Sequence, residues 1–134
     1  MKLRFGPNSI RLRLNQVEVA KFAREGLVLE RVEFPGSKTS ALVYSLRIGQ
    51  DKEGNSVRFE NGEVAVLIPA ADVKAWAENA KEVGIYFTRD LEEGKSLRVS
   101  IEKDFQCSDG PPEEVDPAAY PNPLAKAGCK TERR

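Results

Sequence analysis

A chain of 134 residues with 40% apolar and 31% charged residues is long enough to bury the core of one domain, which excludes a wholly disordered protein. Lys and Arg balance Asp and Glu at 21 each, so any electrostatic function must come from the segregation of charge within the fold. The chain contains no histidine, which excludes Ser–His and Cys–His nucleophile pairs and histidine-bearing zinc sites. The composition therefore leans away from an enzyme without excluding one, and no cofactor is predicted.

The first half of the chain predicts two strands, a helix and two further strands. Apolar and charged residues alternate over 3–5 and 10–14, with the period of two that is typical of half-buried strands. Asn15, followed three residues later by Glu18, forms the capping-box pattern of a helix start. Gly26 favours the left-handed backbone that ends a helix. We expect the two further strands over residues 27–34 and 41–48.

The second half predicts the same order of elements. Residues 3–24 align with residues 57–78 without a gap, so that strand falls on strand and helix on helix. In this alignment the aromatic residue Phe22 falls on Trp76, and both stand on the apolar stripe of their helix. Two later strands are expected over residues 83–89 and 96–105.

The predicted fold class is α+β, with a ββαββ unit written twice. Because tight turns join sequential strands, we expect eight mostly antiparallel strands that form one curved sheet or an open barrel. Two helices should cover the apolar face. The duplicated domain is expected to span residues 1–106, with halves of about 1–50 and 55–106, separated by the charged loop at 49–56.

The last part of the chain differs in composition from the rest. Residues 107–134 are predicted to form an extended, Pro-rich tail, and its segment 109–117 is acidic. We expect this segment to fold back over basic residues of the domain. Cys107 and Cys129 are weak metal candidates, because two thiolates without histidine leave a mononuclear site incomplete. Free thiols are the alternative in a reducing compartment.

The first residues indicate a location. Met1-Lys2-Leu3-Arg4 begins a strand, and the apolar stretch of a secretory signal does not follow it. No apolar run is as long as a transmembrane segment. The sequence therefore predicts a cytoplasmic protein without a membrane partner.

Arginines recur on the polar side of the predicted strands. Their planar guanidinium groups bind phosphate or carboxylate through paired hydrogen bonds, which favours an anion-binding surface. The competing interpretation is a solvated sheet face on which arginine serves solubility and edge protection. The candidate ligand-binding residues are Arg4, Arg11, Arg13, Arg47, Arg58, Arg98 and the accompanying carboxylate Glu102.

Three segments resemble motifs of a small, uncharacterised bacterial family that carries only a domain-of-unknown-function label. They are NSIRLRL at 8–14, IEKDF at 101–105 followed by Cys107, and YPNP at 120–123. This resemblance implies a bacterial, single-domain protein and assigns no functional residue. The strand–helix order is also similar to that of the triphosphate-tunnel (CYTH-like) enzymes. Their eight-stranded barrel binds polyphosphate through inward basic residues and metal-holding glutamates. Their Glu-x-Glu-x-Lys signature is replaced here by Lys2-Leu3-Arg4-Phe5.

Three functions remain open at this point. The first is a non-enzymatic binding module that presents its arginines to an anionic small molecule or an acidic protein segment. The second is a metal-dependent phosphohydrolase of the tunnel type, which requires three or more carboxylates converging with the arginines inside a closed barrel. The third is a structural subunit, and a homodimer stays open. Nucleic acid is not the expected partner, because the net charge is zero.

Overall fold

The computed structural model describes residues 1–37, 40–106, 118, 120 and 121. The first half contains β1 (Lys2–Gly6), β2 (Ser9–Leu14), α1 (Gln16–Glu25), β3 (Leu27–Glu33), β4 (Ala41–Gly49) and the 3-10 turn η1 (Asp51–Glu53). The second half contains β5 (Ser56–Glu60), β6 (Glu63–Pro69), α2 (Ala70–Glu78), β7 (Gly84–Asp90), the 3-10 turn η2 (Glu92–Gly94) and β8 (Ser96–Lys103). Two short strands follow, β9 (Phe105–Gln106) and β10 (Tyr120–Pro121). The order ββαββ therefore occurs twice.

The eight longer strands form two four-stranded sheets. Sheet A has the order β1-β2-β8-β7 and sheet B the order β3-β4-β6-β5, so each sheet combines one hairpin from each half. The central pairs β2–β8 and β4–β6 are parallel, and the hairpin pairs are antiparallel. The α+β class, the eight strands and the two helices are confirmed. Where one curved sheet or an open barrel was expected, the strands form two separate sheets, because the chain changes sheet after each helix.

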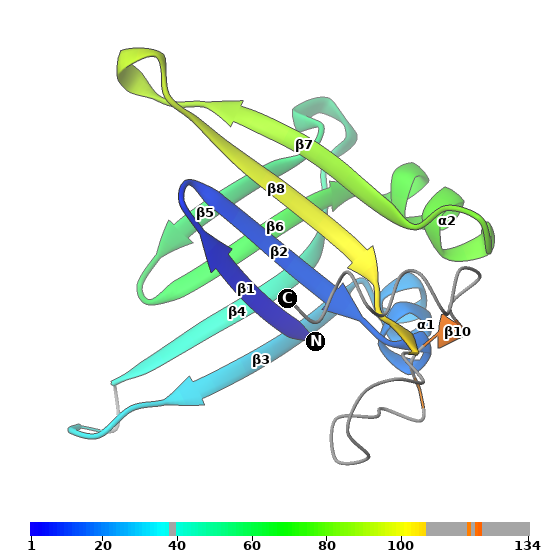
Figure 1. Cartoon of the computed structure of the whole chain (residues 1–134), viewed down its shortest axis with the longest axis horizontal. Coiled ribbons are helices and arrows are strands. Elements are labelled where there is room, and N and C mark those ends of the chain that lie inside the picture. Colours follow the sequence, from blue (N-terminus) through cyan, green and yellow to red (C-terminus); the bar gives the residue numbers. More distant parts are fainter. Residues whose placement is uncertain (38–39, 107–117, 119, 122–134) are drawn as a thin grey trace.

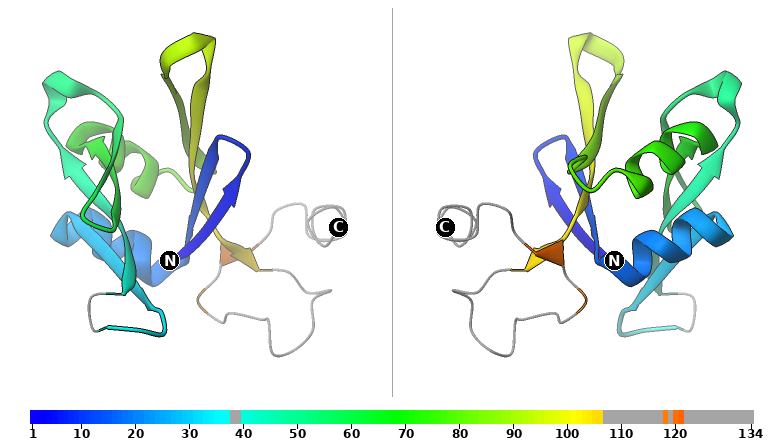
Figure 2. Two further views of the ribbon diagram at one scale, coloured as in Figure 1. Left: turned by 90° about the vertical axis from the view of Figure 1, so that its left-hand side faces the viewer. Right: turned by 90° about the vertical axis from the view of Figure 1, so that its right-hand side faces the viewer.

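Both helices lie at one end of the molecule, and the turns of the hairpins β1–β2, β5–β6 and β7–β8 point toward the other (Figure 1). The side views show the two sheets as two layers (Figure 2). Residues from both sheets and both helices form one hydrophobic core between them. Its largest fully buried side chains are Trp76, Phe22, Leu12, Leu14, Leu46, Ile68 and Ile101.

The predicted capping box explains where α1 begins. The side chain of Asn15 accepts a hydrogen bond from the backbone N–H of Glu18 at 2.9 Å, and the carboxylate of Glu18 accepts one from the backbone N–H of Asn15 at 3.0 Å. The helix ends at Gly26, whose φ of 77° is left-handed. These contacts satisfy backbone groups that a helix leaves without intrahelical partners.

The buried positions of the two halves correspond at an offset of 54 residues. Strand β5 begins and ends 54 positions after β1, and the buried residues Phe22 and Trp76 occupy equivalent positions in α1 and α2. This agreement supports the interpretation of a duplicated unit, and the superposition of the two segments stays a prediction.

Part of the C-terminal segment contacts the domain near the helices. The backbone N–H of Tyr120 donates to the carbonyl of Asp104 at 2.6 Å, and that of Gln16 donates to the carbonyl of Ala118 at 2.8 Å. Tyr120 is half-buried against the core. Cys107, Cys129 and the acidic segment 109–117 lie outside the described residues, as does most of the predicted tail. No helix in the described ranges is long and apolar enough to cross a membrane.

The core predicts the cost of truncating either equivalent aromatic residue. Phe22→Ala and Trp76→Ala should each reduce the free energy of unfolding by about 3–5 kcal/mol, because each deletes a fully buried aromatic side chain. Val17→Ala on the exposed side of α1 is the control and should change stability by less than about 0.5 kcal/mol. Urea unfolding curves would measure all three. A loss below about 1 kcal/mol for either aromatic residue would contradict its place in the core.

Candidate functional site

The strand register gathers basic side chains on the outer face of sheet A. Residues opposite each other in neighbouring strands share a face, and one row across the sheet reads Arg4, Arg11, Ser100 and Tyr86. The next row reads Lys2, Arg13, Glu102 and Gly84, and Arg98 stands in the row on the other side. The opposite face carries core residues such as Leu12 and Ile101. We call the outward cations the basic face: Lys2, Arg4, Arg11, Arg13 and Arg98.

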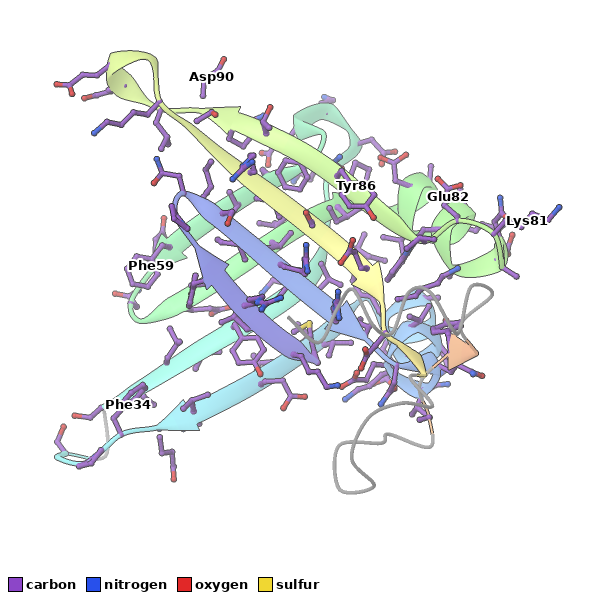
Figure 3. All side chains as sticks on the ribbon, in the orientation of Figure 1. Phe34, Phe59, Lys81, Glu82, Tyr86 and Asp90 are labelled. Atoms are coloured by element: carbon purple, nitrogen blue, oxygen red, sulfur yellow. The ribbon has the colours of Figure 1, made fainter. Side chains whose placement is uncertain are left out.

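Glu102 is a counter-ion built into this face. One of its carboxylate oxygens lies 3.3 Å from Nε of Arg11 and 3.5 Å from Nε of Arg13. The hydroxyl of Tyr86 donates to the other oxygen at 2.8 Å (Figure 3). Partial burial of this hydroxyl, followed by its hydrogen bond to Glu102, raises the pKa of Tyr86 to about 12. Tyr86 therefore stays a hydrogen-bond donor at neutral pH.

The remaining cations of the face differ in how they are paired. Nζ of Lys2 lies 2.8 Å from a carboxylate oxygen of Asp104, which is nearly buried. Arg4 and Arg98 are exposed, and neither forms an ion pair with another residue in the described part of the chain. These two guanidinium groups are therefore the exposed cations of the basic face that no carboxylate of the described residues pairs.

The structure separates Arg47 and Arg58 from the other four arginines. Both lie on the outer face of sheet B, beside Ala65 and Glu63. Arg47 donates through Nη2 to Glu63 at 2.8 Å, and the fully buried hydroxyl of Ser45 donates to the same carboxylate oxygen at 2.5 Å. Sheet B thus balances its arginines with carboxylates around a hollow of about 160 Å³.

The environment of Glu63 favours its ionised form. The hydrogen bond from Ser45, then that from Arg47, lowers the pKa of Glu63 below its ordinary value of 4.5, although partial burial opposes the shift. The positive charges of Arg47 and Arg58 act in the same direction as the hydrogen bonds. Arg47 and Arg58 therefore already stabilise the negative charge of Glu63.

Sequence reasoning missed three residues: Lys2 of the basic face, Tyr86 beside Glu102, and the buried cation Lys103. Lys2 could have been included, because it alternates with Arg4 along one strand. Tyr86 could also have been found, because a tight turn joins β7 to β8 and Tyr86 alternates with the apolar residues Ile85 and Phe87. Lys103 could have been found as well. It is only 2% exposed, and its alternation with Ile101 indicates this inward position.

The buried ammonium of Lys103 has a defined set of partners. It donates to the carbonyl of Asn79 at 2.7 Å and lies 5.8 Å from the ring centroid of Trp76 and 5.4 Å from that of Tyr120. Burial lowers the pKa of Lys103, while the nearby charge of Glu82 opposes the shift. Lys103 therefore links Tyr120, in the C-terminal segment, to α2 and β8.

An apolar groove of about 330 Å³ lies between the two sheets. Its aromatic residues Phe5 and Phe59 are 56% and 71% exposed. Phe34, also exposed, lies with Phe59 toward the end of the molecule away from the helices (Figure 3). The full lining is Phe5, Ile10, Leu42, Val57, Arg58, Phe59, Val64 and Leu97.

The geometry required of a triphosphate-tunnel enzyme is not found in the described residues. The two sheets do not close into a barrel, and the arginines lie on two outward faces instead of converging inside. Within the same ranges, no three Cys, Asp or Glu residues form a group that could hold a metal ion.

These features define a two-sheet α+β protein with a basic outer face on one sheet. The chain belongs to a family of unknown function, DUF7009, whose model matches residues 1–124. No curated protein and no solved structure matches the chain. The family match confirms the predicted membership in an uncharacterised family and assigns no activity to it.

The polar network of sheet B predicts a pH-dependent loss of stability in Ser45→Ala. Because the pKa of Glu63 is lowered in the folded chain, ionised Glu63 contributes stability above pH 4.5, and this contribution is lost as pH falls through the lowered pKa. Ser45→Ala removes the first cause of the shift, so the pKa of Glu63 should rise toward 4.5. NMR titration of the Glu63 side chain would measure this rise.

The same variant should destabilise the chain more at neutral pH than at an acid pH below the pKa of Glu63. Ser96→Ala, at the exposed start of β8, is the control and should leave the pKa of Glu63 unchanged. An unchanged pKa in Ser45→Ala would show that Ser45 does not stabilise the carboxylate.

Proposed function

We propose that this protein is a non-enzymatic binding module whose basic face on sheet A docks an anionic partner. The observation that carries the proposal is the strand register, which puts five cations of the described part of the chain on one outward face, with the carboxylate of Glu102 at its centre. A cytoplasmic, bacterial setting belongs to the same proposal and rests on the sequence alone.

The side chains of this face suit recognition of an anion. Guanidinium groups bind carboxylate and phosphate in paired geometry, and Arg and Tyr are enriched among the residues that dominate protein interfaces. Arg4 and Arg98 are exposed, and Tyr86, on the strand next to that of Arg98, is 58% exposed. A partner can therefore reach guanidinium donors and an aromatic ring without rearrangement of the sheet.

The exposure of the face sets the kind of anion that can bind. Water and salt screen exposed ion pairs, so each contributes about 0–1 kcal/mol. Arg11 and Arg13 also face Glu102, which opposes the approach of another negative charge. A singly charged ligand therefore gains little, and the proposed partner carries several negative charges spaced across the face.

The other candidate functions have less support. A tunnel phosphohydrolase needs converging carboxylates, and Glu102 is the one carboxylate that contacts Arg11 and Arg13 in the described part of the chain. A structural subunit would use apolar surface, for which the groove between the sheets is the available feature. The segregation of charge onto sheet A favours the binding module.

The proposal predicts a salt-dependent loss of binding in Arg4→Ala/Arg98→Ala. Removing two exposed cations should weaken the binding of tripolyphosphate or an oligoglutamate peptide by about tenfold at low salt, since each ion pair contributes at most about 1 kcal/mol. Isothermal titration calorimetry at two salt concentrations would measure the change, and the double variant should show a smaller salt dependence.

The matched control removes two cations from the exposed surface of α1. Lys21→Ala/Arg24→Ala changes the net charge equally and should bind both probes as the unaltered chain does. If neither probe binds the unaltered chain at low salt, the basic face is only a solvated surface and the proposal fails.

A further inference from the structure

Strand β1 forms one edge of sheet A and presents two chemically different sides. Among the described strands it pairs with β2 alone, so part of its backbone N–H and C=O groups face outward. Lys2 and Arg4 lie on the basic face, whereas Leu3 and Phe5 point to the opposite side. Phe5 is 56% exposed and also lines the apolar groove. The edge therefore offers hydrogen bonds, positive charge and apolar surface together.

The other three edge strands lack this combination. On β3, Arg31 lies beside Glu33 on the same strand, with 3.5 Å between the charged atoms. On β5, Arg58 lines the hollow of sheet B together with the carboxylates Glu60 and Glu63. On β7, the outward residues are Gly84, Tyr86, Thr88 and Asp90, none of them a cation. Among the described edge strands, β1 therefore differs from its equivalent β5 in that no carboxylate lies with Arg4 as Glu60 and Glu63 lie with Arg58.

We infer that β1 receives, by strand addition, an extended segment of an acidic partner protein in which acidic and apolar residues alternate. This inference rests on the proposed function and names its partner. A strand added at about 4.8 Å from β1 places its side chains opposite those of β1, about 4.5–5.5 Å away. Its carboxylates then face Lys2 and Arg4, and its apolar residues cover Leu3 and Phe5.

Charge complementarity selects this occupant over a second copy of the chain. Pairing of β1 with β1 of another copy in one continuous sheet would put Lys2 and Arg4 opposite the same cations, which is destabilising. Basic residues on an edge strand commonly prevent self-association in this way. The same residues attract a strand of opposite charge, and Arg4 is the main anchor because Lys2 already contacts Asp104.

The test uses the full chain and two synthetic peptides of identical composition. Acetyl-Glu-Val-Glu-Val-Glu-amide has the alternation, and acetyl-Glu-Glu-Glu-Val-Val-amide has the same charge without it. The alternating peptide should bind at least about tenfold more tightly, since only it satisfies both sides of the edge. On binding, the outward amides of β1 should exchange with solvent more slowly, because they enter new hydrogen bonds.

Two charge-reversal variants locate the site on one edge. Arg4→Glu should abolish the preference for the alternating peptide. Arg58→Glu, at the position of β5 that is equivalent by the offset of 54 residues, should leave it unchanged. Two N-methylated forms of the alternating peptide test the backbone hydrogen bonds. One is methylated at the backbone nitrogens of the glutamates and the other at those of the valines, and at least one of the two should lose the preference.

The outcomes separate this inference from the proposed function. If both peptides and tripolyphosphate bind equally and β1 exchange is unchanged, the basic face binds anions by charge alone and strand addition is wrong. If Arg58→Glu removes the preference as Arg4→Glu does, the assignment to β1 is wrong. If no probe binds at low salt, the proposed function fails as well.

Discussion

The parallel pairing of β2 with β8 is the constraint on which the rest of the structure depends. It joins the two halves of the chain through Leu12 and Ile101, both fully buried, and the equivalent pairing of β4 with β6 does the same in sheet B. Parallel neighbours cannot be connected by a tight turn. Between β2 and β8 the chain therefore passes through both helices and sheet B, and between β4 and β6 it passes through β5. The helices thereby come to lie together at one end.

The same pairing creates the basic face. Because β8 lies beside β2, Glu102 reaches Arg11 and Arg13, and β7 brings Tyr86 to the other side of that carboxylate. Hydrogen bonding and ion pairing hold these side chains across three strands, while Arg4 and Arg98 on the same face form no ion pair within the described residues. Sheet A therefore combines an ordered centre with accessible cations on either side.

On the outer face of sheet B, arginine is paired with a carboxylate. Glu63 accepts hydrogen bonds from both Ser45 and Arg47, and the buried hydroxyl of Ser45 ties this network to the sheet. Within the described part of the chain, sheet B thus pairs its arginines with carboxylates, whereas sheet A carries two exposed arginines without an ion pair. Under the proposed function, this difference directs a multiply charged anion to sheet A. It also distinguishes edge strand β1 from its equivalent, β5.

The sequence by itself determined the local structure of this protein. Alternation assigned each strand residue to a side, the pair Asn15 and Glu18 marked the start of α1, and the offset of 54 residues identified Phe22 and Trp76 as equivalent core positions. These features depend on neighbours along the chain, so the residues themselves encode them. The sequence also indicated that arginines gather on outward strand faces.

Only the tertiary structure decided which strands are neighbours. A period of two tells on which side of its own strand a residue lies, but it carries no information about the adjacent strand. The six arginines therefore looked like one group until the exchange of hairpins between sheets placed Arg47 and Arg58 on a different layer from Arg4. For the same reason, the contact of Arg11 with Glu102 could not be predicted, because it requires that β2 and β8 share a sheet.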